Sequence, residues 1–170
     1  MKIYLDIDGV LADFSNYFIE FYNEIQDKTL PVTEWGDDRI KKYLHLAKND
    51  RKFWLSISPL VSPDDITFNI SGYCTARNPE LYDVTKEWLK LNGFPTAPLF
   101  CVISGKEEVL LGNNVDIFLD DAPHNFMELN RLGIKTYLMD KPYNQHIRTE
   151  LRVRDMQEFG KRVKNETKVS

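Results

Sequence analysis

The stretch MKIYLDIDGVLADF at residues 1–14 decides the fold. Its residues 2–6, KIYLD, are short, apolar and rich in strand-favouring types, so they predict a buried strand. Asp6 and Asp8 follow at the end of that strand. Two carboxylates in such a place repel each other and lose hydration, and both effects disfavour their charged forms. The sequence therefore predicts that a positive charge neutralises this strand end.

Segments that predict strands and segments that predict helices alternate along the rest of the chain. The predicted strands cover residues 66–75, 98–103, 115–121 and 134–139. The predicted helices cover residues 14–25, 78–93 and 122–133, with a polar helix from Arg148 onward. Pro79 near the start of one helix and Gly93 just past its end are typical helix limits. This alternation predicts an α/β fold, a parallel sheet covered by helices on both faces.

Residues 28–61 lack a strong strand pattern and predict an inserted helical segment. We expect a catalytic core formed by residues 1–13 and 62–170, and a small helical cap at residues 14–61, inserted after the first strand. Phe53 and Trp54 form the aromatic edge of that cap.

The composition is that of an ordinary globular protein. The chain has 170 residues, of which 42% are hydrophobic and 28% charged, and its net charge of −4 argues against long nucleic acid as a partner. Cys74 and Cys101 form no CxxC pair and predict buried, reduced thiols. We see no pattern of a signal peptide and no apolar run near the ~20 residues that a membrane span needs. We therefore expect a cytoplasmic protein that does not enter a membrane.

Polar residues follow the predicted parallel strands, at the edge where such sheets bind ligands. They are Asp6 and Asp8, Thr75, Lys106, and the pair Asp120 and Asp121. Carboxylates that converge there raise one another's pKa values. A hard divalent cation with oxygen ligands and retained waters is the simple remedy, which describes Mg²⁺.

The same residues suit phosphoryl transfer. Gly9 allows a sharp turn after the two aspartates and brings backbone N–H groups near an anion. One carboxylate can attack phosphorus while the other serves as acid and then as base. Thr75 and Lys106 supply the hydroxyl and the ammonium that stabilise a phosphoryl group during transfer.

In this order, these residues resemble the four motifs of the haloacid dehalogenase superfamily of phosphohydrolases. The closer similarity is to the 5'(3')-deoxyribonucleotidases. It is carried by DIDGVLADF, YCTARNPE, ISGKEEVLLGNNVDIFLDD and KPYNQH. The resemblance implies a three-layer Rossmann-like core with a parallel sheet and a small helical cap. It also implies a small-molecule nucleotide substrate, and relatives of this kind are often homodimers.

The resemblance further implies roles for individual residues. Asp6 would be the nucleophile and Asp8 the general acid and base. Asp6, the carbonyl of Asp8 and Asp121 would bind Mg²⁺, with Asp120 acting through a water. The implied phosphate contacts are Thr75, the Ala76 amide and Lys106, and the implied base and sugar pocket is lined by Phe14, Phe53 and Trp54. Ala76 stands where the family has serine, so only its amide can contribute.

The main hypothesis is a Mg²⁺-dependent phosphomonoesterase acting on nucleoside monophosphates, deoxyribonucleotides above all. A phosphatase of another small phosphorylated metabolite, such as a sugar phosphate, or of 3'-phosphate ends is the alternative. A third reading is a non-catalytic phosphate-binding module. Taken alone, each residue also has a plain structural reading: Lys106 and Arg77 as solvated side chains, Asp120 and Asp121 as helix caps, and Phe53 and Trp54 as core aromatics.

Overall fold

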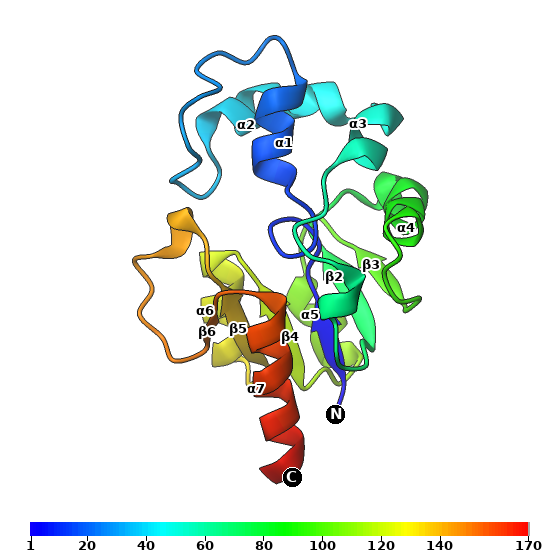
Figure 1. Ribbon diagram of the computed structural model, residues 1–170, viewed down its shortest axis with the longest axis vertical. Coiled ribbons are helices and arrows are strands. Elements are labelled where there is room, and N and C mark those ends of the chain that lie inside the picture. Colours follow the sequence, from blue (N-terminus) through cyan, green and yellow to red (C-terminus); the bar gives the residue numbers. More distant parts are fainter. Residues whose placement is uncertain (170) are drawn as a thin grey trace.

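Six parallel strands form one sheet in the order β3-β2-β1-β4-β5-β6 (Figure 1). This computed structural model describes residues 1–169, with side chains described as far as Glu166. The strands are β1 (Ile3–Leu5), β2 (Gly72–Thr75), β3 (Leu99–Cys101), β4 (Ile117–Asp120), β5 (Lys135–Met139) and β6 (Arg152–Val153). The chain builds outward from β1 on one side to β3, and then returns beside β1 with β4. The carboxyl end of β1 is therefore the switch point at which such sheets bind ligands.

Helices cover both faces of the sheet. Because side chains alternate between the faces along each strand, each strand contributes to two separate cores. Ile3 and Leu5 belong to the larger apolar core, which takes in residues of α4 (Tyr82–Leu91) and α7 (Met156–Val169). Tyr4 belongs to a second core with residues of α5 (Lys106–Gly112) and α6 (Pro123–Arg131). The α/β fold class predicted from the sequence is thereby confirmed.

An inserted helical segment lies between β1 and β2 in the chain. It contains α1 (Phe14–Phe21), α2 (Asp38–Tyr43), a 3-10 turn at Leu44–Ala47, and α3 (Arg51–Ser56). Figure 1 shows α1, α2 and α3 gathered above the carboxyl ends of the strands. Phe53 is fully buried at the centre of this segment, and six other aromatic rings lie with their centroids 5.1–6.0 Å from its own. The division of the chain into a core and a cap stays a prediction.

Several predicted limits are wrong. The strand predicted over residues 66–75 covers only Gly72–Thr75. Ile66, Phe68 and Ile70 instead pack against the core as a loop, with the ring of Phe68 5.2 Å from that of Phe159. The helix predicted over residues 14–25 ends at Phe21.

The regions around residues 106 and 150 also differ from expectation. Helix α5 was not predicted, and the polar helix expected from Arg148 begins only at Met156, after the short strand β6. Both cysteines are buried and free, as predicted. Within residues 1–169, none of the helices combines the length and the apolar character that crossing a membrane requires.

Candidate active site

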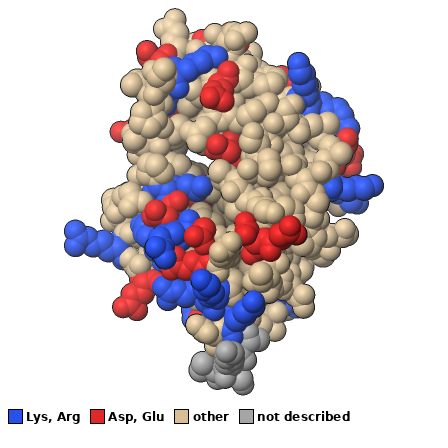
Figure 2. All heavy atoms as spheres, in the orientation of Figure 1, with Lys and Arg blue, Asp and Glu red and all other residues tan. Residues whose placement is uncertain are grey.

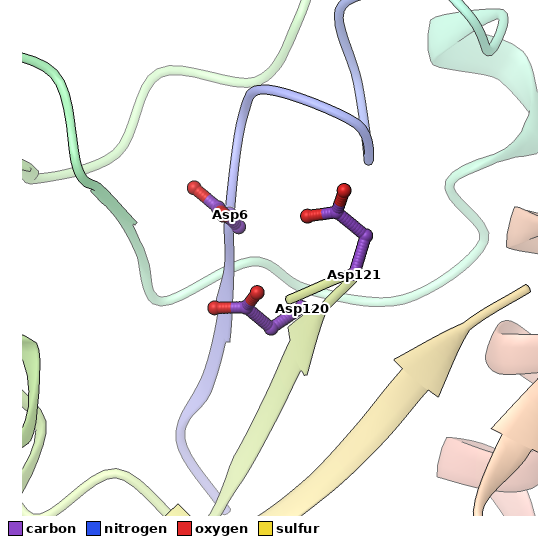
Figure 3. Close-up of side chains that lie close together, drawn as sticks. All are labelled: Asp6, Asp120 and Asp121. Atoms are coloured by element: carbon purple, nitrogen blue, oxygen red, sulfur yellow. The ribbon is translucent and has the colours of Figure 1, made fainter. Parts of the chain in front are cut away.

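Asp6 and Asp120 emerge side by side from the two central strands. Leu5 of β1 is in register with Leu119 of β4, and the amide of Asp6 donates to the carbonyl of Leu119 at 2.9 Å. Figure 3 shows the side chains of Asp6, Asp120 and Asp121 lying close together at this edge. One carboxylate oxygen from each lies within 4.8 Å of the others, and no more than 5% of any of the three residues is exposed. Three buried acids therefore share one small volume.

Lys106 is the cation that meets these acids. It is the first residue of α5, and its Nζ lies 3.0 Å from Asp6 Oδ2 and 2.8 Å from Asp120 Oδ2. Its side chain is only 7% exposed, so the reading of Lys106 as a solvated surface residue is wrong. Asn125 donates to the same Asp120 oxygen at 2.9 Å. One ammonium thus bridges the ends of β1 and β4.

The charge of this site is not fully compensated by Lys106. Burial raises the pKa of Asp6 well above its usual value, against the lowering effect of Lys106. Burial and the nearby charge of Asp120 raise the pKa of Asp121 to about 7, although a hydrogen bond from Tyr143 opposes the shift. Burial by itself lowers the pKa of Lys106, but Asp120 and Asp6 raise it by more. With all three acids ionised, the site would carry more negative charge than one lysine balances, which favours a further cation.

Among the side chains that the structure describes, two buried oxygen atoms lack hydrogen-bond partners, and both lie on residues of this edge. They are Asp121 Oδ1 and Thr75 Oγ1. Buried polar atoms are nearly always paired, so these two oxygens are candidates to contact a ligand. Asp121 Oδ1 offers a carboxylate oxygen next to two other acids, which is the oxygen-rich donor set that a hard divalent cation needs. The residues present therefore fit a divalent metal ion.

Gly9 brings the first loop close to Asp121. Its φ is +78°, and a Cβ built there would lie 2.0 Å from Asp121 Oδ2. Only glycine can occupy this position without displacing the carboxylate. The backbone at Gly9 is thereby packed against the carboxylate of Asp121.

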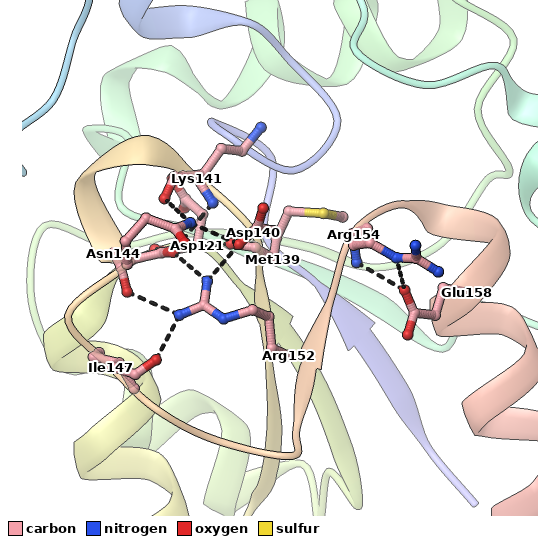
Figure 4. Close-up of polar contacts among 10 residues, drawn as sticks. Asp121, Met139, Asp140, Lys141, Asn144, Ile147, Arg152, Arg154 and Glu158 are labelled. Atoms are coloured by element: carbon pink, nitrogen blue, oxygen red, sulfur yellow. Dashed lines mark hydrogen bonds and ion pairs between the residues drawn. The ribbon is translucent and has the colours of Figure 1, made fainter.

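The loop after β5 supports Asp121 from behind. The Tyr143 hydroxyl donates to Asp121 Oδ2, and Asn144 Nδ2 donates to the Asp121 carbonyl at 2.9 Å. Arg152 of β6 donates to the Asn144 side chain at 2.7 Å and to its carbonyl at 2.9 Å (Figure 4). This network accounts physically for the segment KPYNQH, whose tyrosine and asparagine fix one acid of the cluster.

Asp8 lies apart from the cluster and pairs with a different cation. Arg77 Nε lies 2.9 Å from Asp8 Oδ2, and Arg77 Nη2 lies 2.6 Å from Asp8 Oδ1. The Asp8 side chain is 25% exposed, whereas that of Arg77 is 1% exposed. The expectation that Arg77 is a solvated loop residue is therefore wrong. Its partners come from distant parts of the chain, which is why the local sequence gave no signal.

Two adjoining hollows open beside Asp8, one of about 470 Å³ and one of about 230 Å³. Both are lined by Asp8, Phe14 and Trp35. The smaller hollow also reaches Asp121, and the larger one also reaches Trp54. A continuous wall therefore runs from the acids to the aromatic side chains of the inserted segment.

A family model described as 5' nucleotidase, deoxy (pyrimidine), cytosolic type C protein matches residues 1–166. The chain belongs to this family. A nucleotidase of Clostridium acetobutylicum is 27% identical, and the match covers 86% of each chain. The 5'(3')-deoxyribonucleotidases of Bacillus subtilis and Bacillus phage SPbeta are each 25% identical, with 95% of this chain and 97% of theirs covered. The chain is a nucleotide phosphatase, and the family implies a small nucleotide substrate and a metal ion.

In this nucleotidase, the structure brings most of the predicted site residues to one edge of the sheet. Phe14 and Trp54 stack with centroids 5.6 Å apart and both line the larger hollow, as does the exposed Ala76. Phe53 lies behind them, fully buried, and lines neither hollow. It is placed as a packing residue of the inserted segment.

Trp35 of the nucleotidase is a pocket residue that sequence reasoning missed. It is 46% exposed, and its ring lies 5.4 Å from that of His124 and 5.5 Å from that of Tyr143. These contacts join the inserted segment to the core at Tyr143, whose hydroxyl donates to Asp121. The only local signal was a lone tryptophan in a polar stretch, TEWGDD, where a large apolar side chain lacks a core to join.

Proposed function

We propose that this nucleotidase is a Mg²⁺-dependent phosphomonoesterase that hydrolyses nucleoside monophosphates, deoxyribonucleotides in particular. The observation that carries the proposal is the coincidence of chemistry and shape at one strand end. Asp6 and its partner Lys106 lie at the same sheet edge as the unpartnered Thr75 hydroxyl, beside a hollow lined by Phe14 and Trp54. A nucleophile, donors for a phosphate and a flat apolar wall are what such a substrate requires.

We assign the proposed metal site to the acids of the cluster. Asp6, Asp121 and the carbonyl of Asp8 would hold Mg²⁺, with Asp120 acting through a water. When bound, the ion supplies positive charge that offsets the acids and the phosphate oxygens. The raised pKa values of Asp6 and Asp121 support this assignment, because they reflect carboxylates whose ionised forms are unfavourable without a further cation and would be stabilised by one.

The first chemical step transfers the phosphoryl group to the protein. An oxygen of Asp6 forms a bond to phosphorus while the bond from phosphorus to the sugar oxygen breaks. The electron pair of that bond goes to the sugar oxygen, which takes a proton from Asp8. Thr75, the Ala76 amide and Lys106 donate to the phosphoryl oxygens as charge passes through them.

The second step releases phosphate. Asp8, now ionised, takes a proton from a water molecule that attacks the phosphorus of the aspartyl-phosphate. The bond from phosphorus to the Asp6 oxygen then breaks, and Asp6 is restored as a carboxylate. Each proton that Asp8 gives in the first step is regained in the second, so the cycle balances.

The substrate class follows from the hollow and from the surface charge. Phe14, Trp35 and Trp54 offer aromatic faces against which a nucleobase can stack. Figure 2 shows basic and acidic side chains interspersed on one face of the molecule, and the net charge is −4. This supports a small nucleotide over long nucleic acid. Two relatives are named 5'(3')-deoxyribonucleotidases, which supports a deoxyribose substrate.

A phosphate-release assay across a substrate panel tests the proposal. The panel holds 5'- and 3'-deoxyribonucleotides of each base, the matching ribonucleotides, a hexose phosphate and a 3'-phosphorylated oligonucleotide. We expect release from deoxyribonucleoside monophosphates with Mg²⁺ and none with EDTA. Preferential release from the hexose phosphate or the oligonucleotide would support the alternative substrate classes. A purified protein that releases no phosphate from any of them, with or without metal, would be a binding module.

A further inference from the structure

Arg77 is a buried cation that the proposed mechanism does not use. Its guanidinium makes three side-chain hydrogen bonds, two to Asp8 and one, at 3.2 Å, to Thr85 Oγ1 on α4. Thr85 is itself fully buried. Removing a guanidinium from water is costly, so a buried arginine persists where its geometry is tightly satisfied.

Two tryptophans fix the plane of this guanidinium. Its central carbon lies 4.7 Å from the ring centroid of Trp54 and 5.9 Å from that of Trp88. Trp54 belongs to α3 of the inserted segment, whereas Trp88 belongs to α4 of the core. Each indole N–H is bonded in turn, Trp54 to the Ala47 carbonyl at 2.7 Å and Trp88 to the Ile57 carbonyl at 2.8 Å. The arginine is therefore held in one orientation by parts of the chain that are far apart in sequence.

The oriented guanidinium of Arg77 in turn fixes the orientation of the Asp8 carboxylate. A paired contact from Nε and Nη2 fixes the plane of a carboxylate, because both oxygens are engaged at once. It occupies one lone pair on each oxygen and leaves another free. The Asp8 side chain is 25% exposed and lines the hollow, so a free lone pair can face a ligand there.

We propose that Arg77 is a positioning residue, which holds the Asp8 carboxyl group in the orientation that transfers a proton to the leaving oxygen. The inference rests on the role proposed above for Asp8. Because Arg77 also stacks on Trp54, it ties the placement of the inserted segment to the orientation of Asp8. In the step itself, the bond from phosphorus to the leaving oxygen breaks, its electron pair stays on that oxygen, and the proton comes from Asp8. Arg77 exchanges no proton.

Two esters with different leaving groups separate this role from others. A deoxyribonucleoside leaves as an alkoxide that needs a proton, whereas p-nitrophenolate is a stable anion that departs without one. A residue that orients the acid therefore matters for kcat/KM on dUMP and matters little for kcat/KM on p-nitrophenyl phosphate, because kcat/KM reports the steps up to departure of the leaving group. Hydrolysis of the aspartyl-phosphate, in which Asp8 acts as base, is common to both esters and enters kcat alone. A residue that binds phosphate, or one that merely supports the fold, affects both esters alike.

The experiment measures kcat and KM for both esters in the wild type and in Arg77→Met, Arg77→Lys and Thr85→Val. For Arg77→Met we expect kcat/KM on dUMP to fall about 100-fold, within the range of general acid catalysis, with a loss of only a few-fold on p-nitrophenyl phosphate. KM should not rise for either ester. Arg77→Lys keeps the positive charge but cannot make the paired contact with both Asp8 oxygens. Its loss of kcat/KM on dUMP should therefore be smaller than that of Arg77→Met and equally selective. Thr85→Val should show the same selectivity more weakly.

Arg154→Met is the matched control, because Arg154 is 81% exposed and pairs with Glu158 on the surface. It should leave both esters unaffected. Circular dichroism and thermal melting check that each variant is folded. If Arg77→Met does not fold, Arg77→Lys and Thr85→Val still carry the test.

Three outcomes in the variants overturn the inference. Equal losses of kcat/KM on both esters indicate a general structural role. A raised KM on both indicates a phosphate contact, and a raised kcat/KM on dUMP indicates that Arg77 holds Asp8 away from the leaving group. A wild-type protein that releases no phosphate from any nucleotide overturns the proposed function, and the inference falls with it. A wild type that is active on both esters keeps the two questions separate.

Discussion

The sheet-end site and the inserted helical segment between β1 and β2 are held by different interactions. The sheet-end site consists of Asp6, Thr75, Lys106, Asp120 and Asp121, and the smaller hollow is lined by Asp121 and by residues of the inserted segment. The sheet end collects buried charges and unpartnered oxygens, which are unfavourable for folding in themselves. The inserted segment is built around a fully buried phenylalanine and its ring contacts, which are favourable.

This contrast shows that the sheet-end site lowers the stability of the fold in favour of function, whereas the inserted segment raises it. Register between β1 and β4 places the acids together regardless of their repulsion, whereas packing alone shapes the aromatic wall. Isosteric substitutions of Asp6, Asp121 and Thr75 should therefore change catalysis and leave stability equal or higher. Substitutions in the inserted segment should change substrate affinity where the residue faces the hollow, and stability where it does not.

The largest effect is expected for Asp6→Asn. An amide oxygen is a poor nucleophile, so kcat should fall by about 10⁴-fold or more, as for other nucleophile losses. The fold should survive, because one of several repelling buried charges is removed while Lys106 keeps its contact with Asp120. The measurement is phosphate release together with the thermal midpoint. Asp38→Asn, at a side chain that is 98% exposed, is the matched control. Near wild-type turnover in Asp6→Asn would refute the nucleophile assignment.

The second-largest effect is expected for Asp121→Asn, which should weaken the binding of Mg²⁺. Loss of a direct ligand should raise the Mg²⁺ concentration for half-maximal activity by more than about 100-fold, the upper range for partners outside the ligand set. The measurement is a Mg²⁺ titration of activity. An unchanged midpoint would remove Asp121 from the ligand set.

Asp121→Asn also tests how the stability of the metal-free protein depends on pH. The pKa of Asp121 is raised from 3.8 to about 7 in the folded state, so folded protein binds more protons than unfolded protein between those values. Its stability in EDTA should therefore fall as pH rises from about 4 to about 7. Asp121→Asn should flatten that slope and melt at a higher temperature near pH 7. Thermal melts across this range give the answer, and an identical slope in both proteins would contradict it.

Thr75→Val tests the unpartnered hydroxyl. Valine has nearly the same shape but lacks the donor, so kcat/KM should fall about 100-fold, the scale for one donor lost from a developing charge. Stability should hold or rise, because the buried hydroxyl has no hydrogen-bond partner to lose. Steady-state kinetics and thermal melts decide between this and a purely structural hydroxyl, whose loss would lower stability and leave kinetics unchanged.

Much of the sheet end could be predicted from sequence because its signals are local. The alternation of strands and helices gave the parallel sheet, and the rule that ligands bind at strand ends drew attention to Asp6, Thr75, Lys106 and Asp120. No knowledge of distant contacts was needed for that step. The bridging of Asp6 and Asp120 by Lys106 follows from register once α5 begins at residue 106.

The rest could not be predicted because it depends on contacts between distant segments. Arg77 pairs with Asp8, 69 residues away, and lies between Trp54 of α3 and Trp88 of α4. Strand β6 has two residues, too few for a periodic pattern, yet its Arg152 holds the loop behind Asp121.

The loop that carries Trp35 shows the same limit. Arg39 donates to the carbonyls of Asp27 and Leu30 at 2.7 and 3.0 Å, and to the carboxylate of Asp37. One arginine thus shapes a polar stretch that has no helical or strand pattern. Sequence alone gave no reason to place Trp35 in the wall of the two hollows.

Trp35→Leu is expected to have the smallest effect on activity and compares directly with Phe53→Leu. Trp35 is 46% exposed and lines both hollows, so its loss should raise KM for dUMP about tenfold, the lower end for one base stacked on an aromatic ring. Its kcat and thermal midpoint should change little. Phe53 lines neither hollow, so Phe53→Leu should cost about 1–3 kcal/mol of stability and leave KM unchanged in the folded protein. Equilibrium unfolding and steady-state kinetics on both variants test the pair. If Phe53→Leu raises KM and Trp35→Leu does not, Phe53 rather than Trp35 governs the pocket, and the aromatic core of the inserted segment, not its rim, determines substrate affinity.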